Sequence, residues 1–140
     1  MNKIARIVLN KKKFDLSIVL VGQARIKELN MEYRKINRPT DVLSFLYRDC
    51  YGQARWKMKV NSKGGKLHRP REFSGEIVLC PLIIRQNAKK YKVAFQNELS
   101  RILIHGILHL LGFNHERSKE RARKMRAKEE YYLSKIYGKR

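Results

Sequence analysis

Residues 94–115 read AFQNELSRILIHGILHLLGFNH and contain a long apolar segment. From Ala94 to Leu111 the apolar residues would cover nearly every face of a helix, which is typical of a helix buried in a protein core. Gly112 can adopt the positive φ that ends many helices. The sequence therefore predicts that this helix forms the centre of the fold.

Shorter segments before and after this helix predict both strands and helices. Runs rich in β-branched residues and bounded by turn residues predict strands over 15–21, 42–47 and 75–80. Apolar residues at helical spacing predict helices over 23–37 and 122–136, and Pro81 favours a further helix at its first position. We therefore expect an α+β fold in a single domain over residues 1–140.

Two segments lack a clear pattern. The first dozen residues are ambiguous, because Ile4, Ile7 and Val8 have helical spacing but the run is short. Residues 49–74 combine several Gly and Pro with many Lys and Arg, which predicts a long basic loop.

The chain has 33 Lys and Arg against 12 Asp and Glu in 140 residues, a formal charge of +21. Its 43% hydrophobic residues exclude a disordered chain, and a charge this large favours a polyphosphate partner. Two cysteines do not form a disulfide framework, and no apolar run is long enough to span a bilayer. We therefore expect a cytoplasmic protein that binds no membrane.

Three histidines lie close together at the end of the apolar segment. His105 and His109 would be one helical turn apart on the same face, and a sharp turn at Gly112 would return His115 to them. Three imidazoles leave one position of a tetrahedral Zn²⁺ open, as in catalytic zinc sites. The sequence predicts a metal site here, in which Ni²⁺ or Co²⁺ could replace Zn²⁺. We expect no organic cofactor.

This spacing matches the metzincin peptidase motif, in which a glutamate after the first histidine acts as the general base. Here that position holds Gly106, which argues against proteolysis. Glu98 would lie about 10 Å along the helix axis from His105, so it is expected to support the site rather than act as its base.

The run from His105 to His115 resembles the hallmark motif of the YbeY family of rRNA maturation factors, proposed single-strand-specific endoribonucleases. Residues 29–45, 75–80 and the Met125…Glu129 pattern resemble further blocks of that family in the same order. The resemblance implies a zincin-like fold, with a small mixed sheet packed by helices and the metal-binding helix in the core.

By position, the resemblance makes His105, His109 and His115 the zinc ligands and makes Arg34 an arginine needed for activity. His105 and Arg34 would then be catalytic, with Arg34 stabilising charge on a scissile phosphate. Asn114 departs from the Asp that the family usually has before the last histidine, which keeps the hydrogen-bonding shape but not the charge.

The leading hypothesis is a zinc-dependent endoribonuclease that cuts single-stranded rRNA during maturation of the small ribosomal subunit, with a metal-activated water attacking phosphorus or deprotonating a ribose 2′-OH. One alternative is an rRNA-binding assembly factor whose metal is mainly structural. Another is a metallohydrolase that acts on a different substrate, such as a peptide. The basic loop and the C-terminal helix are expected to hold phosphates in a salt-sensitive manner.

Overall fold

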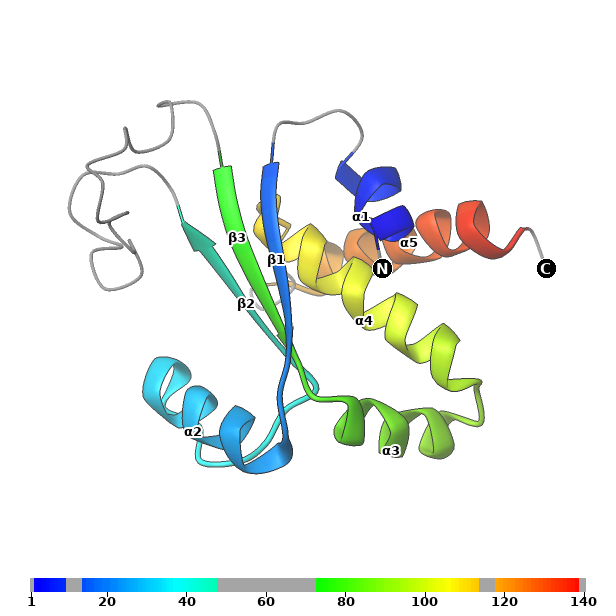
Figure 1. Cartoon of the computed structure of the whole chain (residues 1–140). Coiled ribbons are helices and arrows are strands. Elements are labelled where there is room, and N and C mark those ends of the chain that lie inside the picture. Colours follow the sequence, from blue (N-terminus) through cyan, green and yellow to red (C-terminus); the bar gives the residue numbers. More distant parts are fainter. Residues whose placement is uncertain (1, 10–13, 48–72, 114–117, 139–140) are drawn as a thin grey trace.

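The computed structural model describes residues 2–9, 14–47, 73–113 and 118–138. Its elements follow one another along the chain as α1 (Asn2–Leu9), β1 (Phe14–Leu20), α2 (Gln23–Arg34), β2 (Val42–Tyr47), β3 (Phe73–Leu79), α3 (Pro81–Tyr91), α4 (Phe95–Leu110) and α5 (Lys119–Tyr137) (Figure 1). The predicted α+β class is confirmed. The ambiguous N-terminal segment forms a helix, because Ile4, Val8 and Leu9 are buried in the main apolar cluster.

The three described strands form one sheet in the order β1-β3-β2. β1 runs parallel to β3, with Leu20 opposite Leu79, and β2 runs antiparallel to β3, with Val42 opposite the same residue. The small mixed sheet implied by the family resemblance is therefore present. Because β3 is central, both of its edges are hydrogen-bonded to a neighbouring strand.

Successive residues at the end of β3 belong alternately to two separate apolar clusters, because successive side chains of a strand point to opposite faces of the sheet. Ile77 and Leu79 belong to the larger cluster, which includes residues of α4, α1 and α5. Val78 and Cys80 belong to a smaller cluster with residues of α2. The sheet thus lies between α2 on one face and α4 with its neighbouring helices on the other (Figure 1).

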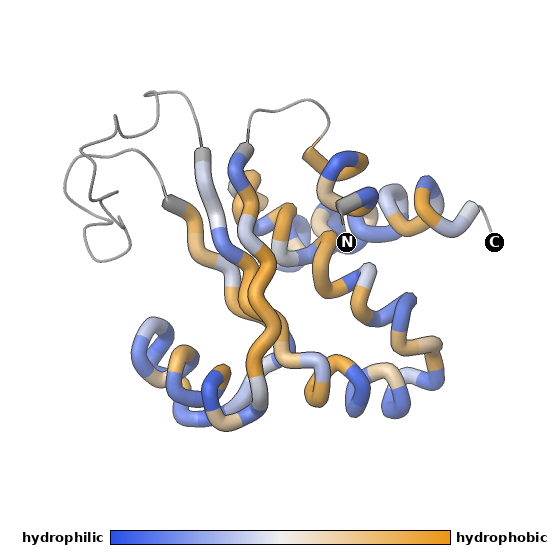
Figure 2. The backbone as a smooth tube through the Cα atoms, viewed as in Figure 1, coloured by the Kyte–Doolittle hydropathy of each residue, from blue (hydrophilic) through white to orange (hydrophobic). Residues whose placement is uncertain are grey.

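α4 is the central helix, as predicted. Its buried residues include Ile102, Leu103, Ile104, Ile107 and Leu108, each at most 3% exposed. α1, α3 and α5 pack against it, so apolar residues concentrate on α4 and the strands while the outer helices carry the hydrophilic ones (Figure 2). No described helix combines the length and the apolar character needed to cross a membrane.

Several predicted boundaries were wrong by one to three residues. The helix predicted over 23–37 ends at Arg34, because Lys35 takes a left-handed conformation with φ 59°. The N–H of Lys35 donates to the carbonyl of Met31, and the N–H of Ile36 donates to that of Asn30. The third strand begins at Phe73 rather than at residue 75, so Phe73 and Ser74 belong to β3 and not to the predicted loop. The rest of that loop, residues 49–72, lies outside the described residues.

The segment between α2 and β2 is held to neighbouring elements by polar contacts. The Asn30 side-chain amide donates a 2.8 Å hydrogen bond to the carbonyl of Arg38. Asp41 accepts from the side chain of Asn87 on α3 at 3.3 Å, and its carbonyl accepts from the backbone of Cys80 at 3.0 Å. These contacts place residue 41, at the start of β2, beside α3.

Candidate metal centre

His105 and His109 of α4 face each other, as their spacing predicts. Their Nε2 atoms are 3.0 Å apart, and their ring centroids are separated by 4.6 Å with an angle of 70° between the planes. Both side chains are partly buried. A helix gives this arrangement without help from other elements, because residues four apart lie one above the other on the same face.

The two imidazoles fit a shared metal ion. Two nitrogens bound to one tetrahedral Zn²⁺ at about 2.0–2.1 Å would lie roughly 3.3 Å from each other. The Nε2 atoms of His105 and His109, at 3.0 Å, are within a few tenths of an ångström of that separation. The donor type also fits, since neutral imidazole is a common ligand of Zn²⁺ and of Ni²⁺.

His105 also contacts Glu129 of α5 through its other ring nitrogen, Nδ1. A carboxylate can only accept, so Nδ1 is the donor to Oε1 of Glu129, and the Nε2 atom on the side of His109 is the one that a metal ion would take as ligand. Glu129 is 5% exposed. A carboxylate behind a histidine commonly fixes the tautomer and the orientation of a metal ligand. Glu129 is placed to do this for His105.

Arg101 joins Glu129 to a second buried carboxylate. Its guanidinium forms two hydrogen bonds with Glu98, at 2.6 and 3.2 Å, and lies 4.0 Å from Oε2 of Glu129. The hydrogen bonds to Glu98 raise the pKa of Arg101, and the carboxylates of Glu129 and Asp41 act in the same direction. The expected supporting role of Glu98 thus takes the form of an ion pair with Arg101.

Gly106, the residue after the first histidine, points toward the sheet rather than toward the histidine pair. A Cβ atom added there would lie 3.1 Å from Oγ of Ser44 and 3.3 Å from Cδ1 of Ile77. Ser44 also donates a 3.3 Å hydrogen bond to the carbonyl of Gly106. The close packing of α4 on β2 and β3 therefore leaves no room for the glutamate that a metzincin peptidase carries at this position.

The other predicted site residues are not brought to the histidine pair by a described contact. His115, the third predicted ligand, and Asn114 lie outside the described residues. Among the residues that are described, no three His, Cys, Asp or Glu side chains are grouped to hold an ion. Arg34 is exposed in the last turn of α2, which packs on the opposite face of the sheet from α4. Its role and the three-histidine ligand set stay predictions.

Glu129 and Arg101 are site residues that the sequence did not reveal as such. Glu129 follows Met125 by one helical turn on the buried face of α5, and a carboxylate on an otherwise apolar face was the available signal. Its partner His105 is 24 positions earlier in the chain. Spacing along one helix cannot indicate a contact between two helices.

The fold and the site define an α+β protein whose central helix presents a pair of histidines, supported by buried carboxylates, toward one shared point. Residues 1–137 match the family model described as "Endoribonuclease YbeY". A relative of that name from Thermodesulfovibrio yellowstonii is 42% identical over 135 residues, covering 96% of this chain and 75% of the relative. Another, from Acetivibrio thermocellus, is 34% identical, covering 97% of this chain and 84% of the relative.

A solved structure shows the same fold. The solution structure of TM1509 from Thermotoga maritima aligns with a TM-score of 0.60 and 31% identity, covering 98% of this chain and 79% of that one. The chain belongs to the Endoribonuclease YbeY family. Membership confirms the family that the sequence resembles and the enzyme class, endoribonuclease, that this resemblance implies.

Proposed function

We propose that the chain is a metal-dependent endoribonuclease that cuts single-stranded rRNA in the cytoplasm during maturation of the small ribosomal subunit. The single observation that carries the metal-dependent part is the convergence of the His105 and His109 Nε2 atoms, 3.0 Å apart, with Glu129 behind His105. His115 completes the proposed ligand set. Zn²⁺ held by these residues would polarise a phosphoryl oxygen and lower the pKa of water to about 7.

The protein's own residues have distinct roles in this proposal. Glu129 holds the imidazole of His105 in one orientation through Nδ1. Arg101 offsets one of the two negative charges of the carboxylates that flank it, Glu98 and Glu129, which lowers the repulsion of a phosphodiester. Arg34, exposed at the end of α2, is proposed to contact the scissile phosphate, where a fixed guanidinium would stabilise the charge that develops in the transition state.

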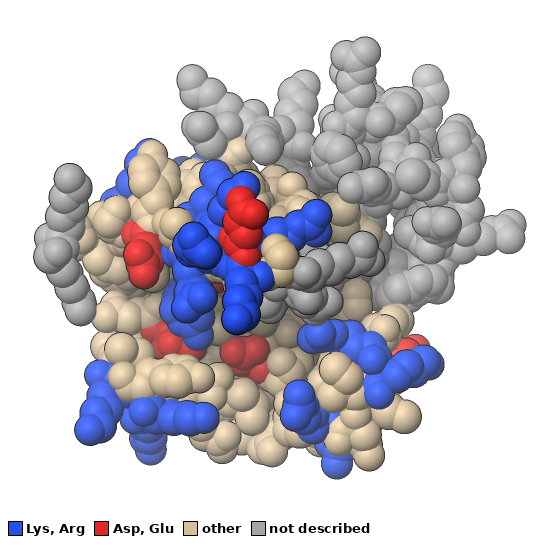
Figure 3. Space-filling view, turned by 180° about the vertical axis from the view of Figure 1, so that it is seen from behind, with Lys and Arg blue, Asp and Glu red and all other residues tan. Residues whose placement is uncertain are grey.

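The charge of the surface supports an RNA substrate. Lys and Arg cover more of the face shown in Figure 3 than Asp and Glu do, and they border a hollow in which acidic side chains also lie. α5 supplies many of the exposed basic residues, namely Lys119, Arg121, Arg123, Lys124, Arg126, Lys128 and Lys135. Such a surface binds phosphates through counterion release, so we expect the affinity for RNA to fall steeply as salt rises.

Cleavage of a labelled single-stranded rRNA fragment by the purified full chain tests the proposal. We expect His105→Ala and Arg34→Ala to abolish or strongly reduce cutting. Gln86→Ala is a control, because Gln86 is exposed on α3 and lies outside the three-histidine motif. Equal cutting by His105→Ala and the unaltered chain would show that the activity belongs to a contaminant. A 2′,3′-cyclic phosphate end would identify attack by the ribose 2′-OH, and a 3′-OH or linear phosphate end would identify attack by water.

The same variants separate the alternative functions. A His105→Ala chain that has lost its metal, still binds rRNA and still supports subunit maturation would favour an assembly factor without catalysis. Loss of maturation with unchanged RNA binding would favour the nuclease. Hydrolysis of peptides is not expected, because the packing of Gly106 against Ser44 and Ile77 excludes the peptidase base.

A further inference from the structure

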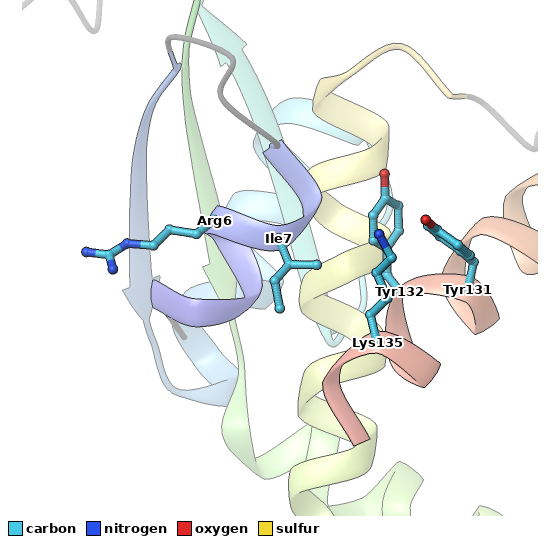
Figure 4. A pocket seen from close by; sticks show the side chains of 5 residues that line it. All are labelled: Arg6, Ile7, Tyr131, Tyr132 and Lys135. Carbon is cyan, nitrogen blue, oxygen red and sulfur yellow. The ribbon is translucent and has the colours of Figure 1, made fainter. Parts of the chain in front are cut away.

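A pocket of about 430 Å³ lies between α1 and α5, apart from the histidine pair (Figure 4). α1 contributes Arg6 and Ile7, and α5 contributes Tyr131, Tyr132 and Lys135. Sites for small organic groups commonly measure roughly 300–1,000 Å³, so the space is sufficient for one nucleotide. None of these five residues has a part in the proposed metal centre.

Aromatic rings and an ammonium group meet in this pocket. The rings of Tyr131 and Tyr132 lie edge to face with centroids 5.2 Å apart, and Tyr131 is 52% exposed. The Nζ atom of Lys135 is 4.7 Å from the centroid of the Tyr131 ring. Ile7 adds an apolar wall from α1, while the guanidinium of Arg6 points away from the two tyrosines (Figure 4). The pocket therefore offers stacking surfaces with one positive charge at their side.

This combination matches the chemistry of a nucleotide in a single strand. Unpaired bases stack on tyrosine rings whatever their sequence, and a lysine binds the phosphate as a point charge. A side-chain hydrogen bond with Tyr131 raises the pKa of Lys135, which moves it further above the neutral range, where a lysine is charged in any case. A single-stranded nucleic acid combines aromatic bases with phosphates, so it fits a pocket that holds tyrosine rings beside a lysine in a chain of +21 charge.

α5 connects the pocket to the metal centre. Tyr131 and Tyr132 come two and three residues after Glu129, which contacts His105. Three residues of helix correspond to about 4.5 Å along its axis, and at roughly 100° a residue Tyr132 projects about 60° round the helix from Glu129, whereas Tyr131 projects from nearly the opposite side. A strand whose phosphodiester lies at the histidines would therefore pass round α5 for one of its bases to enter the pocket.

We propose that the pocket formed by Ile7, Tyr131, Tyr132 and Lys135 is a subsite for one unstacked nucleobase of the RNA substrate, with Lys135 at the adjoining phosphate. This inference rests on the proposed function. The subsite holds the substrate without contacting the scissile bond. It should therefore change the affinity for RNA more than the rate of the chemical step.

Binding of a fluorescein-labelled 2′-O-methyl oligouridylate to the full chain tests the subsite, with the probe checked on a gel after each titration. We expect Tyr131→Ala to raise the Kd between fivefold and about a hundredfold, since base stacking on an aromatic ring is worth roughly 1–3 kcal/mol. Tyr131→Phe keeps the ring and should bind like the unaltered chain. Lys135→Gln should reduce the slope of log K against log salt by about 0.7, whereas Tyr131→Ala should leave it unchanged.

Tyr91→Ala is the matched control. Tyr91 is 54% exposed at the end of α3, with the Nζ atom of Lys90 5.8 Å from its ring centroid, but it is not among the residues that line the pocket between α1 and α5. We expect less than a twofold change in Kd for this variant. Equal losses for Tyr131→Ala and Tyr91→Ala would overturn the subsite alone. Failure of the unaltered chain to bind the probe would overturn the proposed function and the subsite with it.

Discussion

Replacing Glu129 with Gln removes the charge behind His105 while keeping the shape of the side chain. Glu129 is buried, accepts a hydrogen bond from Nδ1 of His105 and lies 4.0 Å from the guanidinium of Arg101. An amide oxygen in its place is a weaker acceptor, so the imidazole becomes less basic and less firmly oriented. Loss of such a carboxylate typically costs 10–100-fold in metal affinity, or about 1.4–2.7 kcal/mol. We expect Glu129→Gln to lie near the lower value and Glu129→Ala near the upper one.

Competition with a chromophoric chelator measures this affinity for Zn²⁺ independently of RNA cleavage. Glu130→Gln provides the control, because Glu130 is the next residue of α5, is exposed and undergoes the same change of charge. A second measurement, the ¹⁵N chemical shifts of the His105 ring, reports the tautomer directly. We expect one Nδ1–H tautomer in the unaltered chain and a mixture in Glu129→Ala. Equal Zn²⁺ affinities for Glu129→Gln and Glu130→Gln would refute the assigned role of Glu129.

Three further substitutions test the packing and the site. Gly106→Ala should lower the free energy of unfolding, measured in urea, by about 1 kcal/mol. The added methyl group gains about 1 kcal/mol of helix propensity but costs roughly 1–3 kcal/mol through overpacking against Ser44 and Ile77. A clear gain in stability would contradict the close packing. Ile107→Ala should cost about 2–5 kcal/mol in the same assay, because Ile107 is fully buried in the main cluster. A loss below 1 kcal/mol would show that α4 is not central. Arg34→Ala should lower the cleavage rate constant by roughly 10²–10³-fold at saturating RNA, with little change in Kd; a change confined to Kd would reduce Arg34 to a binding residue.

The order of the strands and the ends of some elements could not be read from the sequence. The patterns located β1, β2 and β3 within a few residues, because β-branched runs between turn residues are local signals. They did not indicate that β3 lies between β1 and β2, since a strand's period identifies its faces but not its partners. The early end of α2 depends on the left-handed backbone at Lys35, a residue type with no special preference for it.

The central helix and the histidine pair could both be predicted without the structure. Both follow from geometry within one helix, where apolar residues on all faces require burial and residues four apart share a face. Gly106, which stands between His105 and His109 where a metzincin peptidase has its glutamate, also argued against a peptidase from the sequence.

The side chains that surround the histidine pair depend on tertiary contacts. The fold brings Glu129 from α5 to His105, places Arg101 between two buried carboxylates, and packs Gly106 against Ser44, which is 62 positions away. It also forms the pocket between α1 and α5 from residues near opposite ends of the chain. These contacts join elements that are distant in sequence, and they arise because burying the apolar faces of α1, α5 and the sheet against α4 fixes where the polar side chains on those elements must lie.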